Sequence, residues 1–257
     1  MIEIKNLCAG YNKTAVLKDV SLNIAQSSFC AIIGKNGAGK SALLKTLCGL
    51  LTPFSGKILI NGQNPFSLSK AELSKIIAFM PQNIEFSLPF SVRDFIMFGR
   101  YPYMNFFKIP SEKDYEIVKR TMKFTETESF ADRNIDELSG GERQRVLIAQ
   151  TIVQETDFLI FDEPTSHLDI GGQTEIFEIL GILNKETGKT VIVAMHDLNA
   201  AGEFCDSLIL LDGGRVKNAG TPEEVLNYKD IEEVYNTTVI VKTNPISGKP
   251  YIIPYKK

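Results

Sequence analysis

The stretch Gly34-Lys-Asn-Gly-Ala-Gly-Lys-Ser41 fits the pattern G-x-x-x-x-G-K-[ST]. An apolar segment typical of a strand, residues 29–33, comes before it, and residues 41–48 follow with helical spacing. A glycine-rich turn between a strand and a helix points backbone N–H groups and the helix's positive end at one spot. This arrangement suits a polyphosphate, with Lys40 reaching the outer phosphates and the Ser41 hydroxyl holding Mg²⁺. A plain glycine-rich turn is the alternative, but the context favours a nucleotide site.

Two later strands each end in a side chain suited to phosphate chemistry. Residues 158–161 form a short apolar run that is followed by Asp162 and Glu163. Asp162 would lie at the carboxyl end of the strand, where its charge could orient Mg²⁺, and Glu163 could polarise an attacking water. The apolar run 190–195 should lie parallel to this strand, which places His196 at the same edge of the sheet. A histidine at a strand end is more often structural, but we expect His196 to contact the γ-phosphate.

A second helix start has an unusual composition. Ser139 and Glu142 form the S-x-x-E pattern of a capping box, and the helix should extend to about Gln154. The intervening Gly140 and Gly141 are poor helix formers in a first turn, where bare N–H groups attract anions. The sequence therefore suggests a second helix end that faces phosphate.

Composition narrows the class of protein. The chain has 257 residues, 44% of them hydrophobic, and its formal net charge of −3 argues against a general binder of nucleic acid or anionic membranes. It lacks an apolar run of about 18 residues and a signal-peptide pattern at its N-terminus, so we expect a soluble intracellular protein. With two histidines and no C-x-x-C pair, a zinc site is not expected. We expect four reduced, structural cysteines: Cys8, Cys30, Cys48 and Cys205.

The character of the chain changes along its length. Residues 2–8 and 15–33 alternate like strands, with a turn at 10–12 between them. The segment from residue 83 to about 150 is polar and helical, with S-x-x-D helix starts at Ser91 and Ser111. The segment after Tyr235 contains two strand-like runs that predict a hairpin.

Two motifs together carry a family resemblance. The run Leu138-Ser-Gly-Gly-Glu-Arg-Gln-Arg-Val146 and the run Asp162-Glu-Pro-Thr-Ser-His-Leu-Asp169 accompany the phosphate loop. In this combination the chain resembles the ATP-binding subunit of an ABC transporter over essentially its full length. The resemblance implies an α/β fold with a phosphate-loop NTPase core, an N-terminal antiparallel β subdomain and an inserted helical subdomain. It also implies one domain over 1–257, with a core of 1–82 and 155–225, a helical signature subdomain at 83–154 and a tail at 226–257.

The resemblance assigns a role to each matching residue. Catalytic roles go to Glu163 as the base, to His196 as the switch histidine and to Gln82, which touches Mg²⁺ and the attacking water. The implied metal contacts are Ser41, Gln82 and Asp162, and Tyr11 is the aromatic that stacks on adenine. The implied ATP-binding residues are Tyr11, Gly34, Asn36, Gly37, Ala38, Gly39, Lys40, Ser41 and Ala42.

The resemblance also implies partners. Two copies of the chain pack head to tail, and the second copy closes over the ATP bound by the first. The residues that would bind ATP in trans are Ser139, Gly140, Gly141, Glu142 and Asp169. The dimer would sit on two membrane-spanning permease subunits at the cytoplasmic face of the membrane, and through them would serve an extracytoplasmic substrate-binding protein. No nucleic-acid partner is implied.

A narrower resemblance concerns the substrate. Residues 98–103 and the tail runs 243–250 and 252–254 look like the branch that imports iron–siderophore complexes, haem or cobalamin. The alternatives for these motifs are a capped helix with a loop and a surface hairpin. The departures from the family pattern include Ala42, which stands where Thr is usual, and His167, which replaces a small residue in the dimer-contact loop. Residues 26–28 replace a usual Gly-Glu turn, and Gln150 stands where Arg is common.

Other functions remain as alternatives. The chain could serve another importer branch, or it could be a non-transport ABC ATPase, although those carry two cassettes or a long coiled-coil insertion. A phosphate-loop kinase would transfer the γ-phosphate to a metabolite and would have no need of the signature at 138–146.

Overall fold

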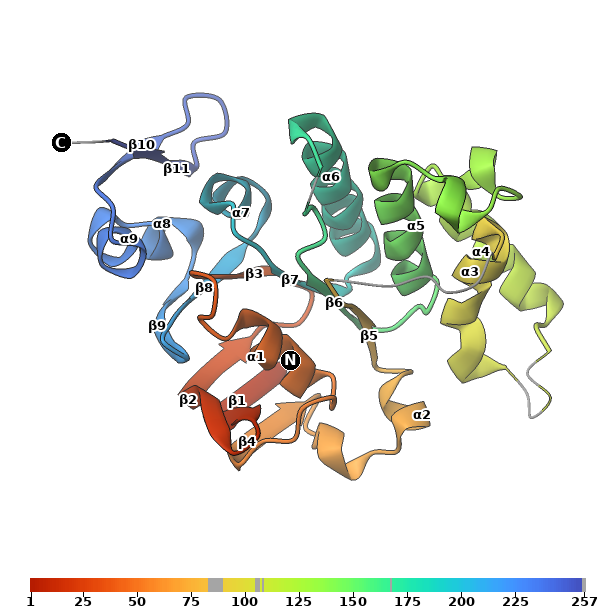
Figure 1. Cartoon of the computed structure of the whole chain (residues 1–257), viewed down its shortest axis with the longest axis horizontal. Helices are drawn as coiled ribbons and strands as arrows, with labels where there is room; N and C mark the ends of the chain where they lie inside the picture. Colours follow the sequence, from red (N-terminus) through yellow and green to blue (C-terminus); the bar gives the residue numbers. More distant parts are fainter. Residues whose placement is uncertain (83–89, 105–106, 108, 167, 256–257) are drawn as a thin grey trace.

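A six-stranded sheet forms the centre of the molecule, in the strand order β5-β6-β7-β3-β8-β9 (Figure 1). The computed structural model describes residues 1–82, 90–104, 107, 109–166 and 168–255. The strands of this sheet are β3 (Phe29–Ile33), β5 (Ile77–Met80), β6 (Phe158–Asp162), β7 (Thr190–Ala194), β8 (Ser207–Asp212) and β9 (Arg215–Gly220). The first five in spatial order are parallel, and β9 pairs antiparallel with β8. Their carboxyl ends therefore meet at one edge, as predicted for the strands that carry Glu163 and His196.

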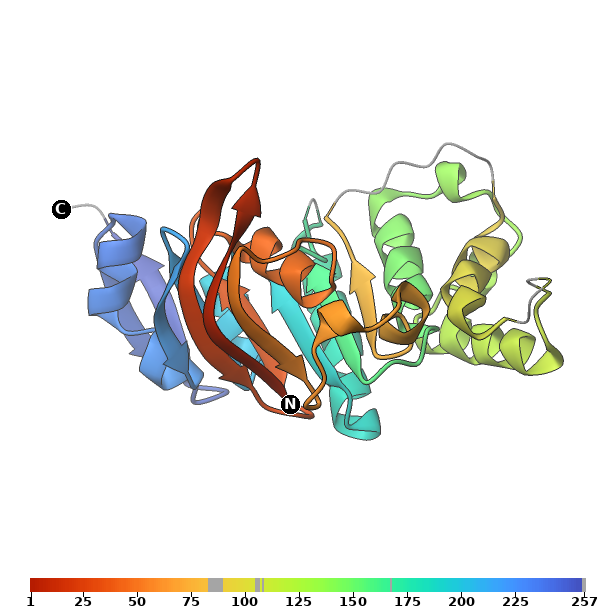
Figure 2. The same ribbon diagram turned by 90° about the horizontal axis from the view of Figure 1, so that it is seen from below.

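An antiparallel sheet of order β2-β1-β4 lies beside the central sheet. Its strands are β1 (Ile2–Tyr11), β2 (Thr14–Ile24) and β4 (Ser55–Ile60). Tyr11, expected in a turn, is the last residue of β1, and the turn falls on Asn12 and Lys13, both with positive φ. Figure 2 shows this sheet as a layer in front of the central one, and helix α1 (Lys40–Leu47) lies between the two sheets (Figure 1).

The two faces of the central sheet are buried against different layers, because successive side chains of a strand alternate between faces. Ala31, Leu159 and Val193 pack in one cluster with the helices drawn above the sheet in Figure 1. Ile32 and Ile160 pack in the other cluster with α1 and the antiparallel sheet. The helices above the sheet are α5 (Gly140–Ile152), α6 (Ile170–Thr187) and α7 (Leu198–Phe204). Strands buried on both faces explain the continuous apolar runs in the sequence.

Between β5 and β6, the described residues form helices packed around a separate apolar cluster. These helices are α3 (Val92–Met97), η2 (Phe98–Tyr103), α4 (Glu112–Phe124), η3 (Glu128–Phe130), η4 (Ile135–Glu137) and α5. Ser91 and Ser111 accept the predicted capping hydrogen bonds, and α5 ends at Ile152, two residues before the expected Gln154. The domain boundaries remain a prediction.

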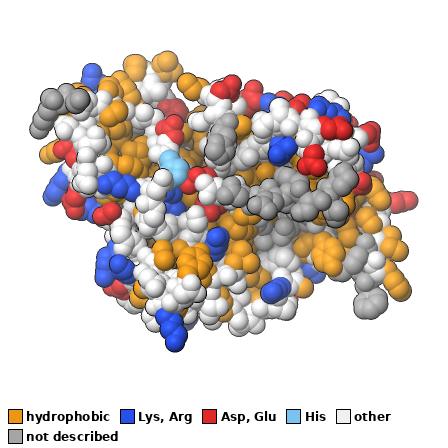
Figure 3. Space-filling view, in the orientation of Figure 1, with side chains coloured by type: hydrophobic (Ala, Val, Ile, Leu, Met, Phe, Trp, Pro, Cys, Tyr) orange, Lys and Arg blue, Asp and Glu red, His pale blue; other side chains and the backbone are white. Residues whose placement is uncertain are grey.

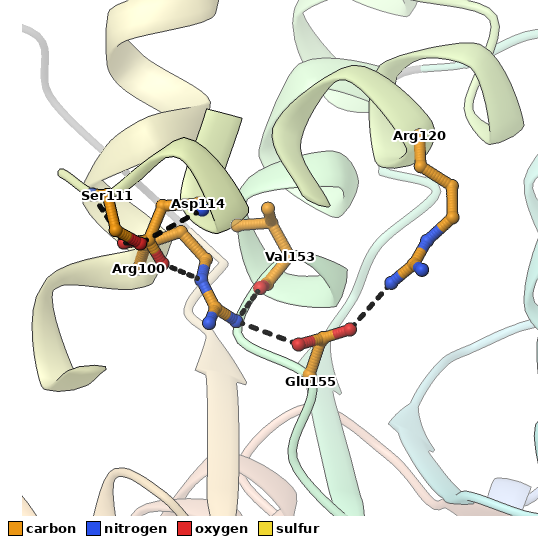
Figure 4. A network of polar contacts seen from close by, with 6 residues as sticks. All are labelled: Arg100, Ser111, Asp114, Arg120, Val153 and Glu155. Carbon is orange, nitrogen blue, oxygen red and sulfur yellow. Dashed lines mark hydrogen bonds and ion pairs between the residues drawn. The ribbon is translucent and has the colours of Figure 1, made fainter. Parts of the chain in front are cut away.

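A buried cation joins these helices to the end of α5 (Figure 4). Arg100 is 4% exposed, and its Nε donates to Oδ1 of Asp114 at 2.9 Å. Its Nη1 donates to the Val153 carbonyl at 2.9 Å and to Glu155 at 3.1 Å. Val153 is the C-cap of α5, so the guanidinium satisfies one of the carbonyls that a helix end leaves unpaired. Gly99 lets η2 come this close, since a Cβ there would lie 2.3 Å from the Gln150 carbonyl.

The remaining elements complete the fold. They are η1 (Pro65–Ser67), α2 (Lys70–Leu73), α8 (Pro222–Val225), α9 (Tyr228–Tyr235), β10 (Val239–Thr243) and β11 (Pro250–Pro254). The predicted hairpin is confirmed: β10 and β11 pair antiparallel. All four cysteines are free, and Cys30 is buried, which raises the pKa of its thiol to about 11. No helix in the described ranges has the length and apolar character needed to cross a membrane. Acidic and basic side chains are both spread over the face shown in Figure 3.

Candidate nucleotide site

The loop between β3 and α1 has the geometry of a phosphate cradle. Gly34 and Gly39 have φ of 147° and 104°, which disfavours residues with a Cβ. A Cβ at Gly34 would lie 2.4 Å from the Leu211 carbonyl, and one at Gly39 would lie 2.8 Å from the Leu17 side chain. Gly39 is also the N-cap of α1 and, among the residues described, receives no side-chain cap. The first N–H groups of α1 are therefore available to an anion.

A cavity of about 420 Å³ opens above this loop. Its lining residues are Tyr11, Val16, Asn36, Gly37, Gly39, Lys40, Ser41, Ala42, Gln82, Glu163 and His196. The lining combines predicted residues from several distant parts of the chain. Val16 was missed, because nothing in the sequence distinguishes it from the other apolar positions of its strand. Gly34 and Ala38 shape the loop without lining the cavity.

The Lys40 ammonium is held at the centre of the site. Its Nζ donates to the Gly34 carbonyl at 2.9 Å and lies 3.3 Å from Nδ1 of His196. Lys40 is only 5% exposed. Burial lowers the pKa of Lys40, and the charges of Glu163 and Asp162 act against this shift. Two nearby carboxylates thus favour the charged form of a buried lysine.

Ser41 and Asp162 form an oxygen-rich corner below Lys40. The Ser41 hydroxyl donates to Oδ1 of Asp162 at 3.1 Å, and Asp162, the last residue of β6, is 2% exposed. Burial raises the pKa of Asp162; the Ser41 hydrogen bond opposes this rise, and the Glu163 charge adds to it. Oxygen donors beside two adjacent carboxylates suit Mg²⁺, so the residues present fit this ion.

Three strand ends bring three polar side chains together. The Glu163 carboxylate accepts a hydrogen bond from Nε2 of Gln82 at 2.6 Å and pairs with Nε2 of His196. Glu163 has a φ of 54°, in the left-handed region, while its N–H donates to the Ala194 carbonyl at 3.0 Å. This local twist explains how adjacent Asp162 and Glu163 both serve the site, although neighbours in a strand point to opposite faces.

The second helix end lies elsewhere in the chain. Ser139 and Glu142 form the predicted capping box, in which the Ser139 N–H donates to Oε2 of Glu142 at 2.8 Å. Asp169 caps α6 by accepting from the Gly172 N–H at 2.8 Å. Within the described part of the chain, none of the residues predicted to act in trans lines the cavity. His167 lies outside the described residues.

The sequence of this chain is similar to those of ABC transporter ATP-binding proteins. The family model described as ABC transporter matches residues 17–166. A ferric enterobactin transport ATP-binding protein from Escherichia coli is 36% identical over 250 residues, covering 97% of this chain and 92% of the relative. A cobalamin import ATP-binding protein from Halobacterium salinarum is 38% identical over 241 residues, covering 94% of this chain and 60% of the relative.

A solved structure agrees with these sequences. It is an inward-facing conformation of a metal-chelate type ABC transporter, with a TM-score of 0.87 and 25% identity, and the match covers 99% of this chain and 97% of that chain. It confirms the expected fold class, a phosphate-loop ATPase core with an antiparallel β subdomain.

Proposed function

This chain belongs to the ABC transporter family, and on that premise we propose that it drives an importer of iron–siderophore complexes, haem or cobalamin. ATP-binding subunits of this family are ATPases coupled to transport. The substrate class is supported by the enterobactin and cobalamin relatives and by the metal-chelate type neighbour. The observation that carries the catalytic assignment is the Glu163 carboxylate, held between Gln82 and His196 beside the phosphate loop.

The geometry suggests how the chain hydrolyses ATP. Glu163 accepts a proton from a water molecule while the oxygen of that water forms a bond to the γ-phosphorus. The bond between the γ-phosphorus and the β–γ bridging oxygen breaks at the same time. Gln82 orients Glu163, and His196 lies where it can contact the γ-phosphate. Lys40 neutralises charge on the outer phosphates. Mg²⁺, held by Ser41, Asp162 and Gln82, would supply further positive charge at the phosphate oxygens.

Hydrolysis requires a second copy of the chain in this proposal. Importer ATP-binding subunits of this family work as dimers with permease subunits. Ser139, Gly140 and Gly141 of one copy close over the ATP on Lys40 of the other, which accounts for a glycine-rich helix start that lies outside the cavity of its own chain. Glu142 and Asp169 contribute to the same contact.

Permease subunits would dock beside the helical block, at the cytoplasmic face of the membrane. Phe98, Tyr101 and Tyr103 are exposed there, a grouping of aromatic side chains typical of protein interfaces. The sequence predicts this surface near Gln82 and over residues 83–110, of which 83–89, 105, 106 and 108 lie outside the described residues. The external substrate-binding protein would be reached only through the permease.

Glu163→Gln tests the proposed chemistry. The amide cannot accept the proton, so turnover should fall by at least about 10²-fold while ATP binding persists. The variant should also become dimeric in saturating Mg-ATP, which gel filtration with light scattering can measure. Glu178→Gln on the exposed side of α6 is a matched control that should behave as wild type.

Three outcomes would contradict the proposal. Wild-type turnover in Glu163→Gln would remove the catalytic base from the scheme, and a variant that stays monomeric in saturating Mg-ATP would remove the dimer. Capture of the tagged chain from gently solubilised native membranes addresses transport. Recovery of a many-spanning membrane protein with it is expected, and its absence would favour a non-transport ATPase.

A further inference from the structure

The C-terminal hairpin β10–β11 packs against α7, the helix that starts directly after the strand end bearing His196. Figure 1 shows the hairpin next to α7, away from the antiparallel sheet. Asp197 is the N-cap of α7, and its side chain accepts from the N–H groups of Asn199 and Ala200. His196 directly precedes this N-cap, so a displacement of α7 can be passed to the His196 backbone.

Asn199 pairs with the hairpin as another strand would. Its Nδ2 donates to the Ile252 carbonyl at 3.2 Å, and its Oδ1 accepts from the Ile252 N–H at 2.7 Å. One side chain thus satisfies both backbone groups of a buried residue, since Ile252 is part of the main core. A residue that replaces this amide with a methyl group leaves both groups of Ile252 unpaired.

Glu203, one turn further along α7, makes a second attachment. Its Oε2 accepts from Nδ2 of Asn244 at 3.2 Å and from the Ser247 hydroxyl at 2.8 Å. The Lys249 ammonium donates to the Glu203 backbone carbonyl. Asn244, Ser247 and Lys249 all belong to the tail motif at 243–250, whose residues otherwise have no part in the site. Gly202 permits the close approach, as a Cβ there would lie 2.9 Å from the Pro250 carbonyl.

The same tail reaches the phosphate loop by another route. Tyr235, the last residue of α9, has its hydroxyl oxygen buried beside the Gly34 backbone, without a regular hydrogen bond among the described atoms. Glu232 of α9 accepts from the Val239 N–H at 3.0 Å, which ties this helix to β10. Gly34 and His196 are both contacts of the Lys40 ammonium. The tail thus contacts the structure next to both Gly34 and His196, two of the residues that surround the Lys40 ammonium.

We propose that the C-terminal tail positions His196 for ATP hydrolysis, and that Asn199 is the positioning residue through which β11 fixes α7. The inference rests on the proposed ATPase function. It adds a role for the tail in which the tail positions His196 without contacting the nucleotide. Asn199 acts through the backbone of α7 and touches none of the reacting groups. The tail motif at 243–250 then has a function, which is to hold α7 in place.

Asn199→Ala tests the proposal in two independent measurements. Because His196 is expected to act on the γ-phosphate during the reaction, kcat should fall about 3- to 10-fold while KM for ATP changes less than about 2-fold. The second measurement is the imidazole NMR signal of His196 at fixed pH. The chain has two histidines, so a His167→Gln background leaves a single signal to follow. Asn199→Ala should shift and broaden it.

Asn218→Ala is the matched control. Asn218 also makes two hydrogen bonds at the start of the tail, to the Glu224 carbonyl at 3.1 Å and to Asp230 at 2.8 Å. It does so from β9, and neither bond involves α7. It should leave kcat and the His196 signal unchanged. Glu203→Ala removes the side-chain bonds to Asn244 and Ser247 and keeps the Lys249 bond to the backbone, so it should repeat the Asn199→Ala result in a milder form. It keeps the test open if Asn199→Ala folds poorly.

The proposal is overturned if Asn199→Ala and Glu203→Ala leave the His196 signal in place, or if Asn218→Ala lowers kcat as much. A wild-type chain without ATP turnover would instead overturn the proposed function. The NMR comparison would still decide whether the tail positions His196.

Discussion

The N-termini of α1 and α5 are both glycine-rich starts to which the sequence assigns phosphate, yet they are built in opposite ways. At α1 the N-cap is Gly39, the first turn contains no acidic residue, and Lys40 is buried. At α5 the cap is Ser139: the Glu142 carboxylate accepts from the Ser139 N–H, and the Ser139 hydroxyl accepts from the Glu142 N–H. One helix end is open to a ligand, and the other already holds its own carboxylate.

The acidic residues near these two helix ends also differ in their burial and in the direction of their pKa shifts. Asp162 comes from another strand and is buried, and burial raises its pKa. Glu142 is more exposed, and its hydrogen bonds with the Ser139 backbone and hydroxyl lower its pKa. A glycine-rich helix start therefore does not by itself make a complete phosphate site. In the proposed dimer, the α1 end would bind ATP within its own chain, whereas the α5 end would offer only the N–H groups of Gly140 and Gly141 to a ligand brought by another copy.

Lys40→Ala should separate the two helix ends most sharply. Removal of the buried ammonium takes away the main positive charge at the outer phosphates, so ATP affinity and turnover should each fall by at least about 10²-fold. Titration calorimetry with ATP measures the affinity, and Lys57→Ala on exposed β4 serves as the control. Equal loss of binding in a Ser139 variant would erase the distinction between the helix ends.

Ser139→Ala should leave ATP binding by each chain unchanged and lower turnover on the order of 10-fold, because it alters a group that acts across the dimer. Loss of the N-cap should also reduce stability by about 1 kcal/mol. Mixing this variant with Lys40→Ala should restore activity above that of either alone. In such a mixed dimer one composite site carries both defects, and the other carries none.

The absence of recovery in the mixture would contradict the head-to-tail arrangement. It would indicate that Ser139 and Lys40 of one chain act in the same site, or that the two residues act in unrelated sites.

Asp162→Asn and Glu142→Gln should change stability in opposite directions, measured by denaturant unfolding in metal-free buffer. The folded-state pKa of Asp162 is raised, so its charge destabilises the fold at neutral pH; the Asn variant should be more stable there, and the difference should close as pH falls through the Asp162 pKa. The folded-state pKa of Glu142 is lowered, so its charge stabilises the fold. Loss of that charge should cost up to about 1 kcal/mol at neutral pH, and the difference should vanish in acid.

Shifts of the same sign in both variants would show that the two acids play equivalent roles. The comparison between the helix ends would then rest on their glycines alone.

Local rules predicted much of the fold from the sequence. The helix starts at Ser91 and Ser111 depend on neighbours within four residues, and both are present. Parallel strands share a carboxyl edge, which is why Glu163 and His196 could be expected to meet. The roles assigned to these residues remain predictions.

Long-range pairing of side chains with backbone could not be predicted. Asn199 bonds to Ile252, and Arg100 bonds to the Val153 carbonyl, through contacts that depend on how whole layers pack. The left-handed backbone of Glu163 is likewise set by the junction of β6 with β7, and an acidic residue gives little sign of it. Gln82 was placed through the family resemblance and not through spacing.

The strand order has a consequence for the order in which the chain can fold during synthesis. β3, which leads into the phosphate loop, pairs only with β7 and β8 within the described structure, so Phe29 meets Val191. At translation rates of about 5–20 residues per second, the ribosome needs on the order of ten seconds to supply those partners. The helical block between β5 and β6 leaves the ribosome sooner and contains its own core. A nascent chain that ends before β7 thus exposes the edges of β3. The nucleotide-binding loop gains its support only after β7 and β8, which lie in the last third of the protein, have been made.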